Sequence, residues 1–249
     1  MSGHSKWVNI RVKKGKMDAL RGKTFTRLAK EIIAAARSGG GDPNGNVRLR
    51  NIIQKAKEAS MPADNITRNI KRGTGELEGV QYEEFTYEGY GPAGVAVIVD
   101  TMSDNRNRTT PEIRSIFRAS GGNMGETGSV SYMFDHQGVI LVNKSVADED
   151  TLLAAALDAG AEDMKSVDDD YFEVTTAPGD VYAVKEALEK AGIHVEEAAA
   201  RMVPETTVAV TGKEAHQVIK MIDTLEEHDD VQDVYYNAEI SEEDIASMA

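Results

Sequence analysis

Charge divides this chain into a basic part and an acidic part. Residues 1–80 carry 17 Lys and Arg against 7 Asp and Glu, a net charge of +10. Residues 81–249 carry 11 against 35, a net of −24, which together with the first value gives −14 for the whole chain. A basic segment of this density favours the phosphates of nucleic acid, and the acidic part is repelled by the same polyanion. The pattern predicts a basic module joined to an acidic body.

Length and composition exclude several classes of protein. A chain of 249 residues suits two or three small domains. The absence of cysteine excludes disulfides and thiolate chemistry, and the five histidines lack the spacing of metal ligands, so no metal is expected. No apolar run approaches the ~20 residues of a bilayer span, and no signal or transit pattern opens the sequence. We expect a cytoplasmic protein without membrane contact.

The basic part has the hydrophobic spacing of helices. The pattern predicts three of them, over residues 18–38, 47–60 and 63–72. In the first, Lys23, Arg27, Lys30 and Arg37 recur at helical spacing and form a cationic stripe beside the apolar one. Three short helices that cover each other's apolar stripes leave a largely cationic exterior.

The pattern changes to strands after residue 79. Residues 135–205 follow the order β-α-β-β-α-β, and the flanking segments each contain β-α-β, which together make a second unit of that kind. This second unit includes an expected strand at 129–134 and a helix at 111–119 capped by Thr110. The predicted α+β fold has a basic N-terminal three-helix domain and two ferredoxin-like α/β domains, one inserted in the other. Their bounds are 1–79, 80–134 plus 206–240, and 135–205, with a tail at 241–249.

Two glycine patterns resemble nucleotide-binding motifs but lack the required context. Residues 89–94 match G-x-G-x-x-G, yet Pro92 lies inside the loop and a strand follows it, which is typical of a β-hairpin turn. Gly22-Lys23-Thr24 resembles the end of a P-loop without a preceding strand. No Ser/His/Asp set or isolated carboxylate pair is evident. We therefore expect no catalytic residues, no cofactor and no small-molecule substrate.

The N-terminal segment combines an aromatic residue with cations. Trp7 is the only tryptophan, and basic residues surround it at Lys6, Arg11, Lys13, Lys14 and Lys16. An indole can stack on an unpaired base while lysines bind the phosphates. Alternatively, Trp7 fills the three-helix core and the lysines are a solvated surface.

A second candidate contact lies in the acidic part, in residues 104–110. Its Asp, Asn and Thr residues suit turns and helix caps. Arg106 and Arg108 are either internal ion-pair partners or a second contact with an anionic partner, and the sequence slightly favours contact.

Several strings in this chain resemble the YebC family over nearly its whole length. These are Gly3-His4-Ser5-Lys6-Trp7, Arg21-Gly22-Lys23, Gly39-Gly40-Gly41-Asp42-Pro43 with Arg48-Leu49-Arg50, Tyr87-Glu88-Gly89-Tyr90-Gly91-Pro92, Asp104-Asn105-Arg106-Asn107-Arg108-Thr109, Gly121-Gly122-Asn123-Met124-Gly125 with Gly128-Ser129-Val130, and Asp229-Asp230-Val231-Gln232-Asp233-Val234-Tyr235. Val12 departs from the basic or histidine residue that members often carry there.

The resemblance implies a basic helical N-terminal domain and two α/β domains. Members have been described as transcriptional regulators that bind DNA, whereas others act on the ribosome, where they help synthesis through difficult stretches such as proline runs. The resemblance therefore implies nucleic-acid binding and leaves the kind of nucleic acid open.

We expect a non-enzymatic translation factor that binds ribosomal RNA on the ribosome, with a DNA-binding transcriptional regulator as the alternative. RNA is favoured because no helix carries an obvious Arg/Asn/Gln face for reading bases, and nothing pairs two basic modules for a palindromic site. A third class, a hydrolase or ligand-binding protein, would use the loop at 89–94. The predicted nucleic-acid contacts are Lys6, Trp7, Arg11, Lys13, Lys14, Lys16, Arg21, Lys23, Arg27, Lys30, Arg48, Arg50, Arg106 and Arg108.

Overall fold

The computed structural model describes residues 17–167, 170–241 and 244–245, with side chains from residue 23 onward. Its N-terminal part contains the helices α2 (Met17–Gly39), α3 (Val47–Glu58) and α4 (Ala63–Thr74). Their shared core includes Leu28, Ile32, Leu49 and Ile66. The three predicted helices are confirmed.

The α2 and α4 helices pack unusually closely at Gly73. A Cβ atom at this position would lie 2.5 Å from the Ile33 carbonyl oxygen and 2.7 Å from the Cβ of Ala36. Both distances are too short for a side chain, so this contact requires glycine. At the start of α3, the side chain of Asn46 accepts a hydrogen bond from the Leu49 amide at 3.0 Å and caps the helix.

The segment expected to form the inserted domain contains one four-stranded antiparallel sheet. Its elements in chain order are β4 (Phe134–Asn143), α6 (Glu149–Asp158), β5 (Asp163–Ser166), β6 (Tyr171–Thr176), α7 (Val181–Lys190) and β7 (Glu197–Pro204). The strands lie in the order β5-β6-β4-β7, and every neighbouring pair is antiparallel. This is the ferredoxin-like arrangement predicted for the segment.

The remaining elements form a second sheet that is interrupted in the chain by the first. They are β1 (Glu83–Tyr90), β2 (Ala96–Ser103), α5 (Arg106–Ala119), β3 (Asn123–Met124), β8 (Val208–Val210), α8 (Gly212–Glu227), β9 (Val231–Tyr236) and β10 (Ala238–Ile240). The sheet order is β3-β1-β2-β9, while β8 pairs in parallel with β10 as a separate ribbon. The α+β class is confirmed, and the proposed domain bounds stay a prediction.

The expected strand at 129–134 is wrong. Ser131–Met133 is a short 3-10 helix, and the strand β4 begins only at Phe134. The buried carboxylate of Glu88 accepts hydrogen bonds from the amides of Gly128, Val130 and Ser131 at 2.8, 2.9 and 2.8 Å. Because this carboxylate uses the backbone donors of the segment, they are not available to a strand partner.

The predicted cap of the α5 helix is also wrong. The helix begins at Arg106, and Asn105 caps it by accepting a hydrogen bond from the Arg108 amide at 3.2 Å. The Thr110 hydroxyl instead forms a 2.8 Å hydrogen bond with the Tyr87 hydroxyl. The loop at 89–94, by contrast, is the hairpin turn expected from its proline, because β1 and β2 pair directly around it.

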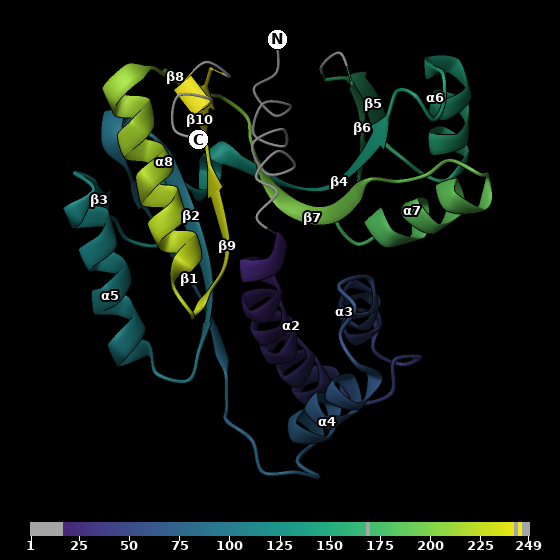
Figure 1. Ribbon diagram of the computed structural model, residues 1–249, viewed down its shortest axis with the longest axis horizontal. Helices are drawn as coiled ribbons and strands as arrows, with labels where there is room; N and C mark the ends of the chain where they lie inside the picture. The colour runs from purple at the N-terminus through teal and green to yellow at the C-terminus, as the bar shows by residue number, and fades with distance from the viewer. Residues whose placement is uncertain (1–16, 168–169, 242–243, 246–249) are drawn as a thin grey trace.

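The alternation of side chains on β2 places apolar groups on both faces of the second sheet. Val97 and Val99 pack with the helices α5 and α8, whereas Ala96 and Ile98 pack with Phe134 of the neighbouring sheet. Figure 1 shows the resulting three lobes, with α2–α4 below, the α5 and α8 sheet at the left and the α6 and α7 sheet at the upper right.

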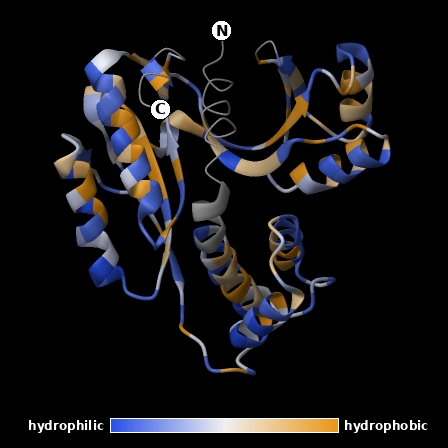
Figure 2. Ribbon diagram, in the orientation of Figure 1, coloured by the Kyte–Doolittle hydropathy of each residue, from blue (hydrophilic) through white to orange (hydrophobic). Residues whose placement is uncertain are grey.

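Hydrophobic residues gather on the strands and on the helix surfaces that pack on them, while α4 is hydrophilic over much of its length (Figure 2). Among the helices that the structure describes, none combines the length and apolar character needed to cross a bilayer.

Candidate nucleic-acid interface

Three of the four cations predicted to form a stripe on α2 face another part of the protein, while the fourth, Arg37, is exposed. Lys23 Nζ donates to the Glu227 carbonyl oxygen at 3.0 Å, and Arg27 Nη2 donates to that of Glu226 at 2.5 Å. Lys30, one turn further along α2, reaches Asp229 and Asp230 in the connection that follows α8. These side chains therefore dock the helical domain onto the acidic part of the chain.

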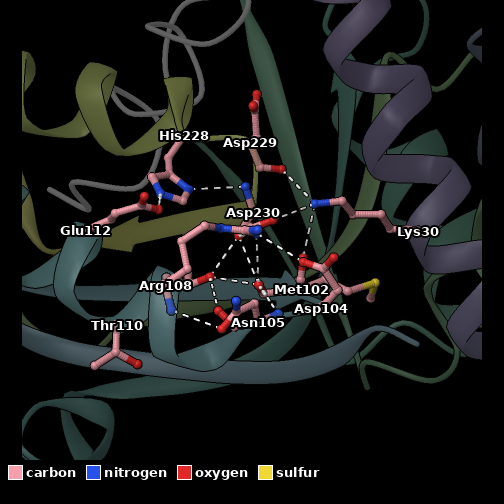
Figure 3. A network of polar contacts seen from close by, with 12 residues as sticks. Lys30, Met102, Asp104, Asn105, Arg108, Thr110, Glu112, His228, Asp229 and Asp230 are labelled. Carbon is pink, nitrogen blue, oxygen red and sulfur yellow. Dashed lines mark hydrogen bonds and ion pairs between the residues drawn. The ribbon is translucent and has the colours of Figure 1, made fainter. Parts of the chain in front are cut away.

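Lys30 lies in a buried polar network, which Figure 3 shows. Its side chain is only 8% exposed, and Nζ donates to Asp230 Oδ1 at 2.8 Å, to the Asp229 carbonyl oxygen at 2.9 Å and to the Met102 carbonyl oxygen at 3.2 Å. A buried ammonium with three acceptors is satisfied inside the protein. In this arrangement Lys30 is not the open phosphate contact that the sequence suggested, because the helical stripe meets a buried carboxylate.

The second oxygen of Asp230 completes the network. It accepts from Arg108 Nη2 at 2.6 Å, from Thr109 Oγ1 at 2.8 Å and from Ser103 Oγ at 3.0 Å. Burial alone would raise the pKa of Asp230, but the hydrogen bonds from Lys30, Arg108 and Thr109 outweigh it and hold the pKa far below its usual value. Asp230 is therefore the ionised centre that joins α2 to α5.

The two arginines predicted in residues 104–110 have different surroundings. Arg108 donates hydrogen bonds to Asp230 and, at 3.1 Å, to Asp104. The hydrogen bond with Asp230 raises the pKa of the Arg108 guanidinium above its ordinary value. Its place fits the internal ion-pair alternative, although the side chain stays 45% exposed. Arg106 is exposed, with its guanidinium 5.0 Å from the centre of the Phe85 ring.

The α3 helix also divides its cations between two directions. Arg48 forms an ion pair with Glu84, and Lys55 lies 5.8 Å from the ring of Tyr182 on α7. Arg50 is exposed. One side of α3 therefore contacts the strand β1 of one α/β unit and the helix α7 of the other.

Several of the predicted contacts lie outside the described residues. These are Lys6, Trp7, Arg11, Lys13, Lys14 and Lys16, and the side chain of Arg21 is likewise not described.

The face of α4 was missed by the sequence analysis. Asn65, Arg68, Asn69 and Arg72 follow one another at intervals of three, one and three residues, which places them on one side of the helix. They line a cavity of about 370 Å³, together with residues of α2 and Tyr82. Helical spacing in the sequence was the signal that could have revealed this face, while the expectation that no helix reads the bases of duplex DNA stays a prediction.

A group of carboxylates lies near the domain contacts. Burial raises the pKa of Glu31 on α2, Lys55 opposes this effect, and the nearby Asp233 and Glu84 add to it. Burial likewise raises the pKa of Asp100 on β2, against a 2.7 Å hydrogen bond from Thr86. Within the described part of the chain, no three carboxylate or histidine groups are arranged to hold a metal ion.

Comparison with known proteins gives consistent matches over almost the whole chain. Residues 5–76 match the family model described as "TACO1/YebC protein N-terminal domain", and residues 82–238 match "TACO1/YebC second and third domain". The chain is 57% identical over 244 residues to a "Probable transcriptional regulatory protein" of Pelotomaculum thermopropionicum, covering 97% of this chain and 100% of that protein.

Other relatives are similarly close. A "Probable transcriptional regulatory protein" of Geobacter sulfurreducens is 56% identical over 248 residues, covering 100% of both chains. The crystal structure of a conserved hypothetical protein from Aquifex aeolicus superposes with a TM-score of 0.81 at 49% identity, covering 92% of this chain and 94% of that one. With family models, sequence relatives and fold in agreement, the chain belongs to the TACO1/YebC family.

Proposed function

We propose that this protein regulates gene expression by binding nucleic acid, as a translation factor on the ribosome. Its helical domain contacts ribosomal RNA, and its α/β domains set the orientation of that domain. The protein performs no chemistry and stabilises a productive arrangement of the bound substrates, which eases synthesis through difficult stretches such as proline runs.

One observation carries this proposal. After the cations of α2 have docked onto the acidic part, the helical domain still exposes basic side chains on α3 and α4, namely Arg50, Lys57, Arg68 and Lys71. Exposed cations of this density, on a chain with a net charge of −14, favour phosphate contacts at this one domain.

The shape of the α4 face favours RNA with unpaired nucleotides over duplex DNA. A helix that reads the major groove must protrude into a channel about 12 Å wide. Asn69, in the middle of the α4 face, is only 6% exposed and lines a cavity. A concave site of this kind suits a nucleotide that has left its stack.

The names of the relatives favour the second candidate, a DNA-binding transcriptional regulator. In that case, α3 and α4 would contact a duplex, and a dimer with regularly spaced half-sites would be expected.

Crosslinking of the protein to nucleic acid in cells, with RNA and DNA sequenced from one sample, tests the choice. We expect ribosomal RNA to be enriched at a few contiguous sites. Enrichment of discrete promoter DNA over background RNA would instead establish the transcriptional regulator.

A matched pair of variants serves as the control. Replacement of Arg50, Lys57 and Lys71 by Ala should remove the enrichment. Replacement of Lys190, Lys213 and Lys220, which are exposed in the acidic part, removes the same charge and should preserve it.

A further inference from the structure

The cavity between α2 and α4 has walls of two kinds. Ile33 and Met61 are apolar and buried, and the aromatic rings of Phe25 and Tyr82 are half-buried. The polar face of α4 supplies a second wall, and Thr26, Ala29 and Lys30 of α2 complete the lining. An apolar pocket with a few convergent polar groups is the usual form of a ligand site, and about 370 Å³ lies near the lower end of the range for such sites.

The polar wall offers two kinds of recognition. Asn65 and Asn69 carry amides, each with donors and an acceptor that can meet the polar edge of a base. Arg68 is exposed and has no ion-pair partner among the described residues, while Arg72 Nη1 donates to Asn69 Oδ1 at 3.4 Å. Guanidinium groups here can bind a phosphate in a bidentate manner.

Tyr82 is held at the cavity by the docking network. Lys30 Nζ lies 5.4 Å from the centre of the Tyr82 ring, and the same ammonium is fixed by Asp230. The ring is therefore positioned by a cation that is itself buried and satisfied. Aromatic side chains of this kind provide stacking platforms for unpaired bases.

We propose that this cavity holds one unpaired nucleotide of RNA, with its base among Phe25, Tyr82 and the two asparagines and its phosphate at Arg68 and Arg72. This site deepens the proposed function and rests on it, because the nucleotide is supplied by the bound RNA. The docked helical domain then binds RNA phosphates through its exposed cations and recognises an unpaired nucleotide through the cavity.

The test compares two probes of equal charge on the full-length protein. One is a labelled hexamer of adenosine RNA, and the other is a hexamer of the same phosphodiester backbone without bases. Binding is measured by fluorescence anisotropy. The wild-type protein should prefer the RNA by about tenfold or more, since one stacked base contributes at this level.

Substitutions test whether the preference for RNA over the probe without bases comes from the cavity. Tyr82→Ala should reduce it to within about threefold while affinity for the abasic probe is kept, and Tyr82→Phe should restore it. Arg68→Ala should weaken binding of both probes. Tyr132→Ala is the matched control, because Tyr132 is an exposed tyrosine outside the cavity, and its removal should leave the preference intact. An undiminished preference in Tyr82→Ala would overturn the inference.

Crosslinking supplies a readout that does not depend on folding of a variant. An RNA containing 4-thiouridine is crosslinked to wild-type protein, and the attached peptides are mapped. Crosslinks at Phe25 or Tyr82 are expected, and crosslinks confined to other segments would contradict the site. Equal affinity for a deoxyadenosine hexamer would remove the assignment to RNA.

Failure of the proposed function would give a different result. If wild-type protein binds neither hexamer, RNA binding is excluded under those conditions, and the cavity is then titrated with AMP. Binding of AMP that is lost in Tyr82→Ala would uphold the nucleotide site alone. Absence of AMP binding as well would overturn both.

Discussion

Two helices of the basic domain carry polar stripes of similar spacing, but one stripe contacts the acidic part of the chain and the other includes an exposed arginine at a cavity. On α2, Lys23, Arg27 and Lys30 donate to groups in residues 226–230. On α4, Arg68 is exposed at a cavity. A basic stripe on a helix therefore predicts an anionic partner, and this partner can be another part of the same chain.

The consequence for the protein is a division of roles between the two helices. The α2 stripe joins the domains, and the ammonium of Lys30 is paired there with a buried carboxylate. On α4, Arg68 stays exposed, and we propose that it contacts an external partner. Substitutions on the two helices should therefore change different properties.

The largest effect is expected from Asp230→Ala. Loss of this carboxylate leaves Lys30 buried without its ion pair and removes one of the two carboxylates that Arg108 bonds, which should lower the free energy of unfolding by about 3–5 kcal/mol. Urea titration followed by circular dichroism measures the change. The matched control is Asp229→Ala, whose exposed side chain is removed while its carbonyl oxygen still accepts from Lys30. Equal stability of the two variants would show that the network does not hold the domains.

Paired substitutions on the two helices separate docking from binding. Arg68→Ala with Arg72→Ala should weaken RNA binding by about tenfold and flatten the slope of log affinity against log salt by about 1.4, because two phosphate contacts are lost. Lys23→Ala with Arg27→Ala should leave that slope unchanged and lower the urea midpoint instead. Filter binding over a series of salt concentrations provides the comparison. A change of slope in the α2 pair equal to that in the α4 pair would remove the distinction between them.

Acid should weaken the contact between α2 and the acidic part, because this contact depends on ionised Asp230. The folded pKa of Asp230 is lowered, so its stabilisation is present above the ordinary Asp pKa of about 3.9 and is lost as the pH falls toward the folded value. The stability difference between wild type and Asp230→Ala should be constant from pH 7 to pH 5 and shrink below about pH 4. Urea midpoints of both proteins across this range test it, and a difference that persists undiminished at pH 3 would argue against the ionised centre.

The smallest effect is expected at Glu31, and it has the opposite sign. Its folded pKa is raised by burial, so the charged form is disfavoured in the folded protein, and stability falls as the pH rises through the folded value. Glu31→Gln should therefore raise the urea midpoint at pH 7, by less than Asp230→Ala lowers it, with no gain at pH 4. Glu126→Gln, at an exposed position, is the control and should have no effect at either pH.

Much of the fold could be predicted from local patterns. The helices α2, α3 and α4 and the β-α-β-β-α-β order of the inserted segment follow from hydrophobic spacing, and both are confirmed. The strand expected at 129–134 failed because Glu88, distant in sequence, bonds the amides of that segment. Such a contact leaves no local signal.

The candidate site was less accessible to prediction. The density of charge pointed to the helical domain, but it did not distinguish Lys30, which is buried, from Arg68, which is exposed. Both are cations on amphipathic helices. Their roles depend on what lies opposite, and no periodicity within one helix contains that information.

The sequence by itself determined the three helices of the basic domain, the order of helices and strands in residues 135–205, and that the positive charge belongs to the first 80 residues. These properties depend on neighbours along the chain, through side-chain period and composition. Only the tertiary structure decided that Asp230 meets Lys30 across 200 positions and that the α4 face borders a cavity. The free energy of a buried charge depends on its partners in space, so the same basic stripe holds domains together on one helix and stays open on another.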